Sequence, residues 1–344
     1  MPVNPPAPSL TSLYAARAGA LPARFRRERV LIVGCGDVGL RAAALLRPRT
    51  RLLALTSSPE RAPLLRQQGI VPLQGNLDND ASLRRLSGLA TRVLHLAPPP
   101  TEGQAQWWLD PRTAALLRAL RRRPMAGSLV YGSTSGVYGD CAGEWVDEAR
   151  PLNAQTPRAL RRVDAERQVR HLGRASIASP MGAVRASVLR IPGIYAADRE
   201  GGTPQARLHK GTPVLRAEDD VFTNHIHADD LARACMLALW RGRAQRTYNV
   251  SDDSELKMGD YYDAAADLYG LPRPPRVPRS TAADALPLML LSFMSESRRL
   301  LNARMKRELR LSLRYPTVLD GLRAGVVAGG AQAAPPGAVT RPTA

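Results

Sequence analysis

A short apolar strand followed at once by a glycine-rich turn and a helix is the feature that most restricts how this chain can fold. Residues 29–33 read RVLIV, residues 34–39 read GCGDVG, and residues 40–46 read LRAAALL. In a G-x-G-x-x-G turn the first glycine permits the tight turn, the second lets the main chain approach a diphosphate, and the third allows helix and strand to pack closely. The helix N-terminus offers unpaired N–H groups to the phosphates. The pattern predicts a dinucleotide site formed by Gly34, Cys35, Gly36, Asp37, Val38 and Gly39.

The strand-then-helix order repeats along the first half of the chain. Strands are expected at residues 51–55, 71–77, 92–97 and 128–131, and helices from about Asp80 and over 111–122. Repeated βα units predict an α/β fold with a Rossmann-like, doubly wound parallel sheet. Ligands of such sheets bind outside the carboxyl ends of the strands. We therefore expect one cleft along the residues after Val33, Leu55, Gly75, Ala97 and Tyr131, with Ala97 and Pro98 at the cofactor.

Composition excludes several other classes of protein. The chain has 344 residues, of which 44% are apolar, so it can build a core and is not a disordered chain. Cys35, Cys141 and Cys235 are scattered, which indicates a reducing compartment and neither a disulfide framework nor a zinc module. The longest apolar stretch, 285–294, is about half the length that a membrane helix needs. We expect a cytoplasmic protein with no membrane partner and a disordered arm over residues 1–28.

A formal net charge of +19 is typical of proteins that bind nucleic acids. Lysine occurs only at Lys210, Lys257 and Lys306, which leaves 46 arginines among the 49 basic residues. This ratio, together with abundant alanine, indicates GC-rich codon usage. Aromatic residues make up 5%, too few for a platform that stacks bases. We expect weak, non-specific attraction to polyanions and no specific nucleic-acid partner.

The second expected strand ends in Thr56-Ser57-Ser58-Pro59-Glu60-Arg61. An NAD site usually has a carboxylate at this tip to accept the ribose 2′-OH, and here hydroxyl groups take its place. Ser57, Ser58 and Arg61 suit a 2′-phosphate, so the tip favours NADP. NAD remains an alternative because Glu60 lies near the distance expected for such an acid. The same residues also make a good helix start, with Ser58 as N-cap and Pro59 at the first position.

The fifth strand tip reads GSTSGVYGD over residues 132–140, and further motifs read LRIPGIY at 189–195, HIHADDLA at 225–232 and YNVSD at 248–252. With the glycine turn, these motifs resemble the short-chain dehydrogenase/reductase superfamily, in its atypical or extended NAD-dependent epimerase/dehydratase branch. The resemblance implies that Thr134 binds the substrate oxygen and that Pro192 to Ile194 lie beside the nicotinamide. It also implies that Asn76 and Leu77 lie beside the adenine, and it allows a homodimer.

One departure from the family pattern concerns its YxxxK dyad, in which the tyrosine transfers a proton and the lysine lowers its pKa. The corresponding positions are Arg158 and Arg162, and no lysine precedes Lys210. A guanidinium keeps the positive charge but passes no proton near neutral pH. Tyr138 and Tyr195 are the nearest substitutes by sequence, although each is more often a packed tyrosine at its position.

Two histidines and two acids have the residue types of a metal site, since His225 and His227 alternate along a strand before Asp229 and Asp230. The favoured interpretation is that one of the two aspartates caps the following helix, with no metal bound. Similarly, Cys35 is expected to be a buried filler and not a reactive thiol, and His95 a core histidine.

The chain divides in this interpretation into a nucleotide-binding domain, a smaller C-terminal substrate lobe and two disordered ends. The ranges expected are 29–190 plus about 222–250, 191–221 plus 251–322, and a tail over 323–344. The function expected is an NADP-dependent oxidoreductase that acts on a small carbonyl, hydroxyl or sugar-type substrate. Its rival is a non-catalytic dinucleotide-binding redox sensor or interaction module.

Overall fold

A computed structural model describes residues 28–101, 106–123, 127–177, 183–286, 290–291 and 294–333 of the protein. Its central sheet consists of β1 (Glu28–Val33), β2 (Thr50–Thr56), β3 (Val71–Gln74), β4 (Arg92–His95), β5 (Gly127–Thr134), β7 (Val184–Ile191) and β11 (Arg246–Asn249). The order is β11-β7-β5-β4-β1-β2-β3, and all neighbours are parallel. The strand order reverses beside β1, which places a ligand crevice at its carboxyl end. The predicted doubly wound sheet is confirmed.

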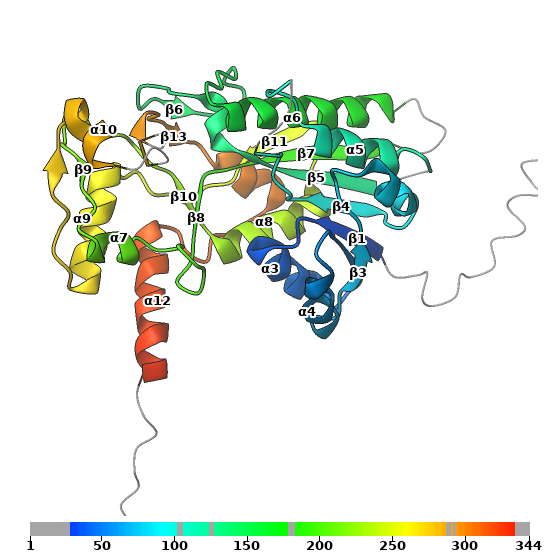
Figure 1. Ribbon diagram of the computed structural model, residues 1–344, viewed down its shortest axis with the longest axis horizontal. Helices are drawn as coiled ribbons and strands as arrows, with labels where there is room; N and C mark the ends of the chain where they lie inside the picture. The colour runs from blue at the N-terminus through cyan, green and yellow to red at the C-terminus, as the bar shows by residue number, and fades with distance from the viewer. Residues whose placement is uncertain are drawn as a thin grey trace, which may run out of the picture.

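Alternation along the strands produces a core on each face of the sheet. Val30 and Ile32 belong to one apolar cluster and Leu31 and Val33 to the other, because successive strand residues point to opposite faces. Helices α3 (Asp37–Leu46) and α8 (Ala228–Arg241) cover the first face. Helices α5 (Pro111–Leu120) and α6 (Pro157–Ala175) cover the second, with the short turn η2 (Asp80–Leu86) (Figure 1).

A third apolar cluster fills a separate lobe at one end of the sheet (Figure 1). Its buried members lie between Tyr195 and Val221 and between Met258 and Leu322. The elements of this lobe are α7 (Gln205–His209), β9 (Val214–Leu215), α9 (Met258–Tyr269), β12 (Arg276–Val277), the turn η4 (Arg279–Thr281), α10 (Ala282–Ala285) and α12 (Val318–Ala333). Between lobe and sheet, β8 (Gly193–Tyr195) pairs with β10 (His225–His227). The predicted domain limits stay a prediction.

Several expected elements differ from those found. The basic segment 297–309 was expected in the lobe, but Met305 and Leu309 of the π-helical turn η5 (Met305–Leu309) are buried against α8 in the core of the sheet. The segment joins β6 (Trp145–Val146) through β13 (Arg299–Leu300). The burial of these apolar side chains decides where the segment lies, and the number of basic residues in the segment does not indicate it.

Helix α12 continues to Ala333, so 323–333 is not the disordered tail expected, and the rest of that tail lies outside the described residues. Strand β1 begins at Glu28, and residues 1–27 of the expected arm also lie outside the described residues. The sequence also predicts a helix over 282–293; α10 (Ala282–Ala285) and the helical residues 290 and 291 agree with it, and 287–289 and 292–293 lie outside the described residues. Within the described ranges, none of the helices has the length and apolarity needed to cross a bilayer.

Candidate functional site

The glycine turn after β1 leaves one side of the main chain open. Gly34 has φ +86°, and a Cβ there would lie 2.3 Å from the backbone nitrogen of Ala97. A Cβ at Gly39 would lie 3.0 Å from the carbonyl oxygen of Gly34, so α3 packs closely on the turn. At Gly36, by contrast, a Cβ would meet no described atom within 4 Å. The turn therefore fits an approaching diphosphate, with Gly36 at the open face of the α3 N-terminus.

The remaining residues of the turn form its support. Val38 is buried in the core under the sheet. The thiol of Cys35 is buried, which raises its pKa to about 11 although the charge of Arg61 opposes the shift. Such a thiol stays protonated near neutral pH, as expected of a filler.

The tip of β2 presents hydroxyl groups and one guanidinium. Ser57 is exposed, Ser58 is half-buried, and the buried Thr56 hydroxyl accepts the N–H of Ser58 at 3.2 Å. The Arg61 guanidinium donates through Nη2 to the carbonyl oxygen of Cys35 at 2.7 Å. The structure thus brings Arg61 from the second tip onto the glycine turn, and its other N–H groups have no described partner.

The other predicted cofactor residues lie at neighbouring tips. Ala97 is buried against Gly34, and Pro98 after it is exposed. Asn76 is exposed in the turn after β3, where its side chain accepts the N–H of Asp78 at 3.0 Å, and Leu77 is half-buried. Pro192 and Ile194 are half-buried at the end of β7 and in β8.

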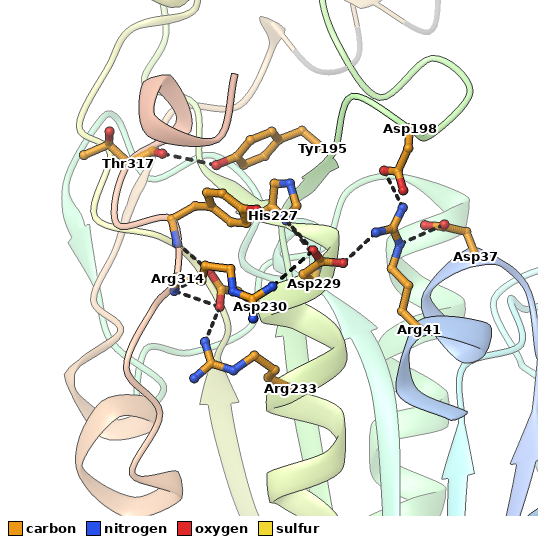
Figure 2. Close-up of polar contacts among 11 residues, drawn as sticks. Asp37, Arg41, Tyr195, Asp198, His227, Asp229, Asp230, Arg233, Arg314 and Thr317 are labelled. Atoms are coloured by element: carbon orange, nitrogen blue, oxygen red, sulfur yellow. Dashed lines mark hydrogen bonds and ion pairs between the residues drawn. The ribbon is translucent and has the colours of Figure 1, made fainter. Parts of the chain in front are cut away.

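A cluster of charged side chains that the sequence interpretation missed lies beside the turn (Figure 2). Arg41 bonds three carboxylates: Asp37 at 3.0 Å, Asp198 at 2.6 Å and Asp229 at 2.6 Å. Arg199 holds the other oxygen of Asp37 at 2.5 Å. These bonds tie the loop after β8 and the start of α8 to the first turn of α3. Only the spacing of Asp37 and Arg41, one helical turn apart, was visible in the sequence.

The expected cap of α8 is wrong. His227 is the N-cap, and its Nδ1 accepts the N–H of Asp229 at 3.2 Å. Asp230 is fully buried and accepts the N–H groups of Arg314 and Tyr315, each at 2.9 Å (Figure 2). Asp230 was not available as a cap because it holds a segment 84 residues later in the chain.

The two histidines differ in environment from a metal site. His225 is buried, and burial lowers its pKa to about 4, so the ring is neutral. Burial also lowers the pKa of His227, against the pull of Asp229 and Asp230. In the described parts of the chain, no group of three potential ligands is close enough to hold a metal ion. His95 is a core histidine as predicted, with Nε2 2.9 Å from the hydroxyl of Thr113.

Neither candidate tyrosine is placed as a proton donor. Tyr138 is buried, its hydroxyl donates to Oδ1 of Asn249 at 2.7 Å, and burial raises its pKa to about 12. Tyr195 is also buried, and its hydroxyl donates to the carbonyl oxygen of Thr317 at 3.2 Å. Burial, followed by the nearby Asp252 charge, raises the Tyr195 pKa far above its usual range. Both phenols serve the packing of the fold, as the favoured interpretation of their positions predicted.

Thr134 ends β5, and the two arginines predicted at the dyad positions lie on α6. Thr134 is half-buried and its hydroxyl accepts the N–H of Gly136 at 3.3 Å, at the start of the turn η3 (Ser135–Tyr138). Arg158 and Arg162 are one helical turn apart on α6, the first exposed and the second buried. Arg162 donates through Nη1 to the carbonyl oxygen of Gly132 at 2.5 Å.

A buried ion pair supports this end of the sheet. Glu166 of α6 binds Arg190 of β7 through two bonds, at 3.1 and 2.8 Å, and accepts the hydroxyl of Ser133 at 2.7 Å. Arg190 also lies 4.7 Å from the ring centre of Tyr138. This network fixes the strand tips next to Thr134.

Comparison with known proteins gives one family. The profile of the NAD dependent epimerase/dehydratase family matches residues 30–251, and no curated protein matches the chain. A functionally unknown conserved protein from Silicibacter pomeroyi DSS has 29% identity and TM-score 0.69, over 88% of this chain and 99% of that one.

Two more distant solved structures have the same fold. RMD from Pseudomonas aeruginosa, solved with NADPH, has 20% identity and TM-score 0.64, over 87% of this chain and 98% of that one. UDP-glucose 4-epimerase from Thermus thermophilus, solved with NAD, has 19% identity and TM-score 0.65, over the same shares of 87% and 98%.

Proposed function

The chain belongs to the NAD-dependent epimerase/dehydratase family, as its motifs predicted, and on this premise we propose that it is an NADP-dependent oxidoreductase of a small carbonyl, hydroxyl or sugar-type compound. The observation that carries the proposal is the open face of the glycine turn at Gly36, which leaves room for a diphosphate at the N-terminus of α3. Relatives of this fold that were solved with NADPH or NAD support the same cofactor class.

The tip of β2 supports NADP over NAD. The hydroxyl groups of Ser57 and Ser58 and the guanidinium of Arg61 suit a 2′-phosphate, and each charge-assisted bond to it is worth about 1.5–3 kcal/mol. Arg61 is already oriented by its bond to the Cys35 carbonyl, so less entropy is lost on binding.

The chemistry proposed for the site follows from the groups present. A bound nicotinamide supplies or accepts the hydride. Thr134 orients the substrate oxygen from the end of β5, and the guanidinium groups of Arg158 and Arg162 stabilise negative charge nearby. Proton exchange takes place with water, because Tyr138 and Tyr195 are buried and hydrogen-bonded elsewhere.

The test is titration of the purified protein with NADPH and NADH, followed by the fluorescence of the reduced nicotinamide. We expect NADPH to bind at least tenfold more tightly, and Arg61→Gln to remove most of this preference. Glu60→Gln tests the alternative, because loss of this acid weakens NADH binding if Glu60 holds the ribose of NAD. Absence of binding by either cofactor refutes the proposal.

A second function, a non-catalytic redox sensor, is favoured by one observation, the absence of a tyrosine that could replace the dyad among the described residues at this site. A panel of carbonyl compounds followed at the nicotinamide absorbance separates the two functions once NADPH binding is established. Turnover that falls in Thr134→Ala supports an enzyme, whereas NADPH binding without any turnover supports the sensor.

A further inference from the structure

Arg162 is a buried cation that makes no direct ion pair with a described carboxylate. The residue is only 8% exposed, and no ion pair joins it to any acid in the described ranges. A second buried arginine, Arg190 of β7, has Glu166 at 2.8 Å. A buried charge without a partner destabilises the fold, because no ion pair offsets the free energy lost when the charge leaves water.

The hydrogen bonds of Arg162 are also incomplete. Nη1 donates to the Gly132 carbonyl at 2.5 Å and to the Tyr131 hydroxyl at 3.1 Å. Nε is buried and has no hydrogen-bond partner in the described chain. The nearby carboxylate of Asp110 accepts the Thr113 hydroxyl at 2.7 Å at the start of α5 and makes no ion pair with Arg162. The charge of Asp110 acts on Arg162 only through space, so no described carboxylate is in direct contact with this guanidinium.

Arg158 adds a second unopposed charge one turn earlier on α6. It is exposed and makes neither an ion pair nor a hydrogen bond with any residue the structure describes. Partial loss of water lowers its pKa, and the charge of Arg162 lowers it further. Two like charges at positions i and i+4 destabilise a helix unless something between them is negative.

The pair lies at the ligand-binding edge of the sheet. Because α6 returns from β5 to the parallel strand β7, its first turn is at the carboxyl end of the strands. A Cβ built at Gly136 would lie 3.6 Å from the Thr134 hydroxyl and 3.9 Å from Cβ of Ala159, the residue after Arg158. Arg162 itself bonds the carbonyl of Gly132, two residues before Thr134 on β5, and Arg158 lies one helical turn earlier on α6.

The proposed phosphate sites of a dinucleotide lie at other strands than the arginine pair. The glycine turn follows β1 and the proposed 2′-phosphate site follows β2, whereas the arginines accompany β5. Strands lie about 4.8 Å apart, so β5 is about 10 Å from β1 and about 14 Å from β2. The counter-ion has to belong to another molecule or to another part of the substrate.

We propose that Arg158 and Arg162 form an oxyanion subsite, so that the substrate carries a carboxylate or phosphate group close to the oxygen held by Thr134. The inference rests on the proposed function and narrows its substrate class. It replaces the lost proton-transfer dyad with charge recognition, and it accounts for both arginines together.

The test uses inorganic phosphate and acetate as probes of the full-length protein with NADP⁺ bound. Each anion is titrated by calorimetry at constant ionic strength, with sodium chloride as the balance. We expect saturable binding in the millimolar range, and at least a fivefold weaker affinity in Arg158→Gln with partial recovery in Arg158→Lys. Arg121→Gln is the matched control, since Arg121 is an equally exposed arginine at the other end of the sheet, where α5 ends.

The outcomes separate this inference from the proposed function. Tighter phosphate binding indicates a phosphorylated substrate and tighter acetate binding a carboxylate. If NADP⁺ binds but neither anion does, or if Arg121→Gln weakens the anions as much as Arg158→Gln, the subsite does not exist. Displacement of NADP⁺ by phosphate also overturns it, because the anion then occupies the cofactor site. Failure of NADP⁺ itself to bind counts against the proposed function.

Discussion

We predict that Gly36→Ala leaves the fold intact and abolishes tight binding of NADPH. Gly36 has φ −81°, which any residue adopts, and an added Cβ meets no described atom within 4 Å. Loss of glycine's freedom in the unfolded chain adds about 0.4–1 kcal/mol of stability. Alanine is a poorer N-cap than glycine, and this lowers the free energy of unfolding by about the same amount. The free energy of unfolding should therefore change by less than about 1 kcal/mol.

Binding should respond differently, because the new methyl group occupies the space through which the diphosphate approaches the N–H groups of α3. Loss of even one charge-assisted bond costs about 1.5–3 kcal/mol, which corresponds to a Kd raised at least tenfold. The assay pairs urea unfolding with a fluorescence titration of NADPH on the same protein sample.

Gly34→Ala provides the contrast. Its φ of +86° disfavours any side chain, and its Cβ would lie 2.3 Å from the Ala97 backbone, so the tip of β4 has to move. We expect a loss of more than about 2 kcal/mol in unfolding free energy, with weaker binding as a consequence of the damaged fold. Wild-type affinity in a stably folded Gly36→Ala protein would falsify the assignment of the diphosphate to this turn.

Three further predictions concern charged groups. Arg41→Met removes the shared partner of three carboxylates and should lower the free energy of unfolding, measured in urea, by about 2 kcal/mol. The loss is small for three ion pairs because the side chain of Asp198 is 71% exposed. An unchanged urea midpoint contradicts this prediction. Burial raises the pKa of Asp252 to about 8, so the free energy of unfolding of the wild-type protein should fall as the pH rises from 4 to 8. Asp252→Asn removes the titrating carboxyl and should flatten this pH profile. If the profiles of the wild type and the variant are parallel, the pKa shift is disproved. Glu166→Gln should lower the free energy of unfolding by about 3–5 kcal/mol, because Arg190 stays charged and buried without its partner. The double variant Glu166→Leu/Arg190→Met removes both charges and should lose less stability. Equal losses in the two variants refute the pairing.

The local patterns of the sequence were sufficient for the sheet and the glycine turn. Alternating apolar residues in 30–33 and the G-x-G-x-x-G spacing depend on neighbours within a few positions, and the structure has the predicted strand, turn and helix there. The replacement of the dyad by Arg158 and Arg162 was predicted from motif positions alone, and it stays a prediction.

Contacts between distant residues were not readable in the same way. The hydroxyl of Tyr138 is occupied by Asn249, 111 residues later, and the carboxylate of Asp230 by the N–H groups of Arg314 and Tyr315. Similarly, the sequence placed the segment after residue 297 in the substrate lobe, although Met305 and Leu309 are buried beside α8 in the core of the sheet. Each of these partners is adjacent only after the chain has folded.

The sequence by itself therefore determined the architecture and the location of the glycine turn, because periodicity and glycine placement act over single turns and strands. Only the tertiary structure decided which charges remain unpaired. Arg41 meets three acids from three segments, whereas Arg162, equally basic in sequence, is buried without an ion pair to any acid that the structure describes. The cost of a buried charge depends on the groups that folding brings around it, and no local pattern records them.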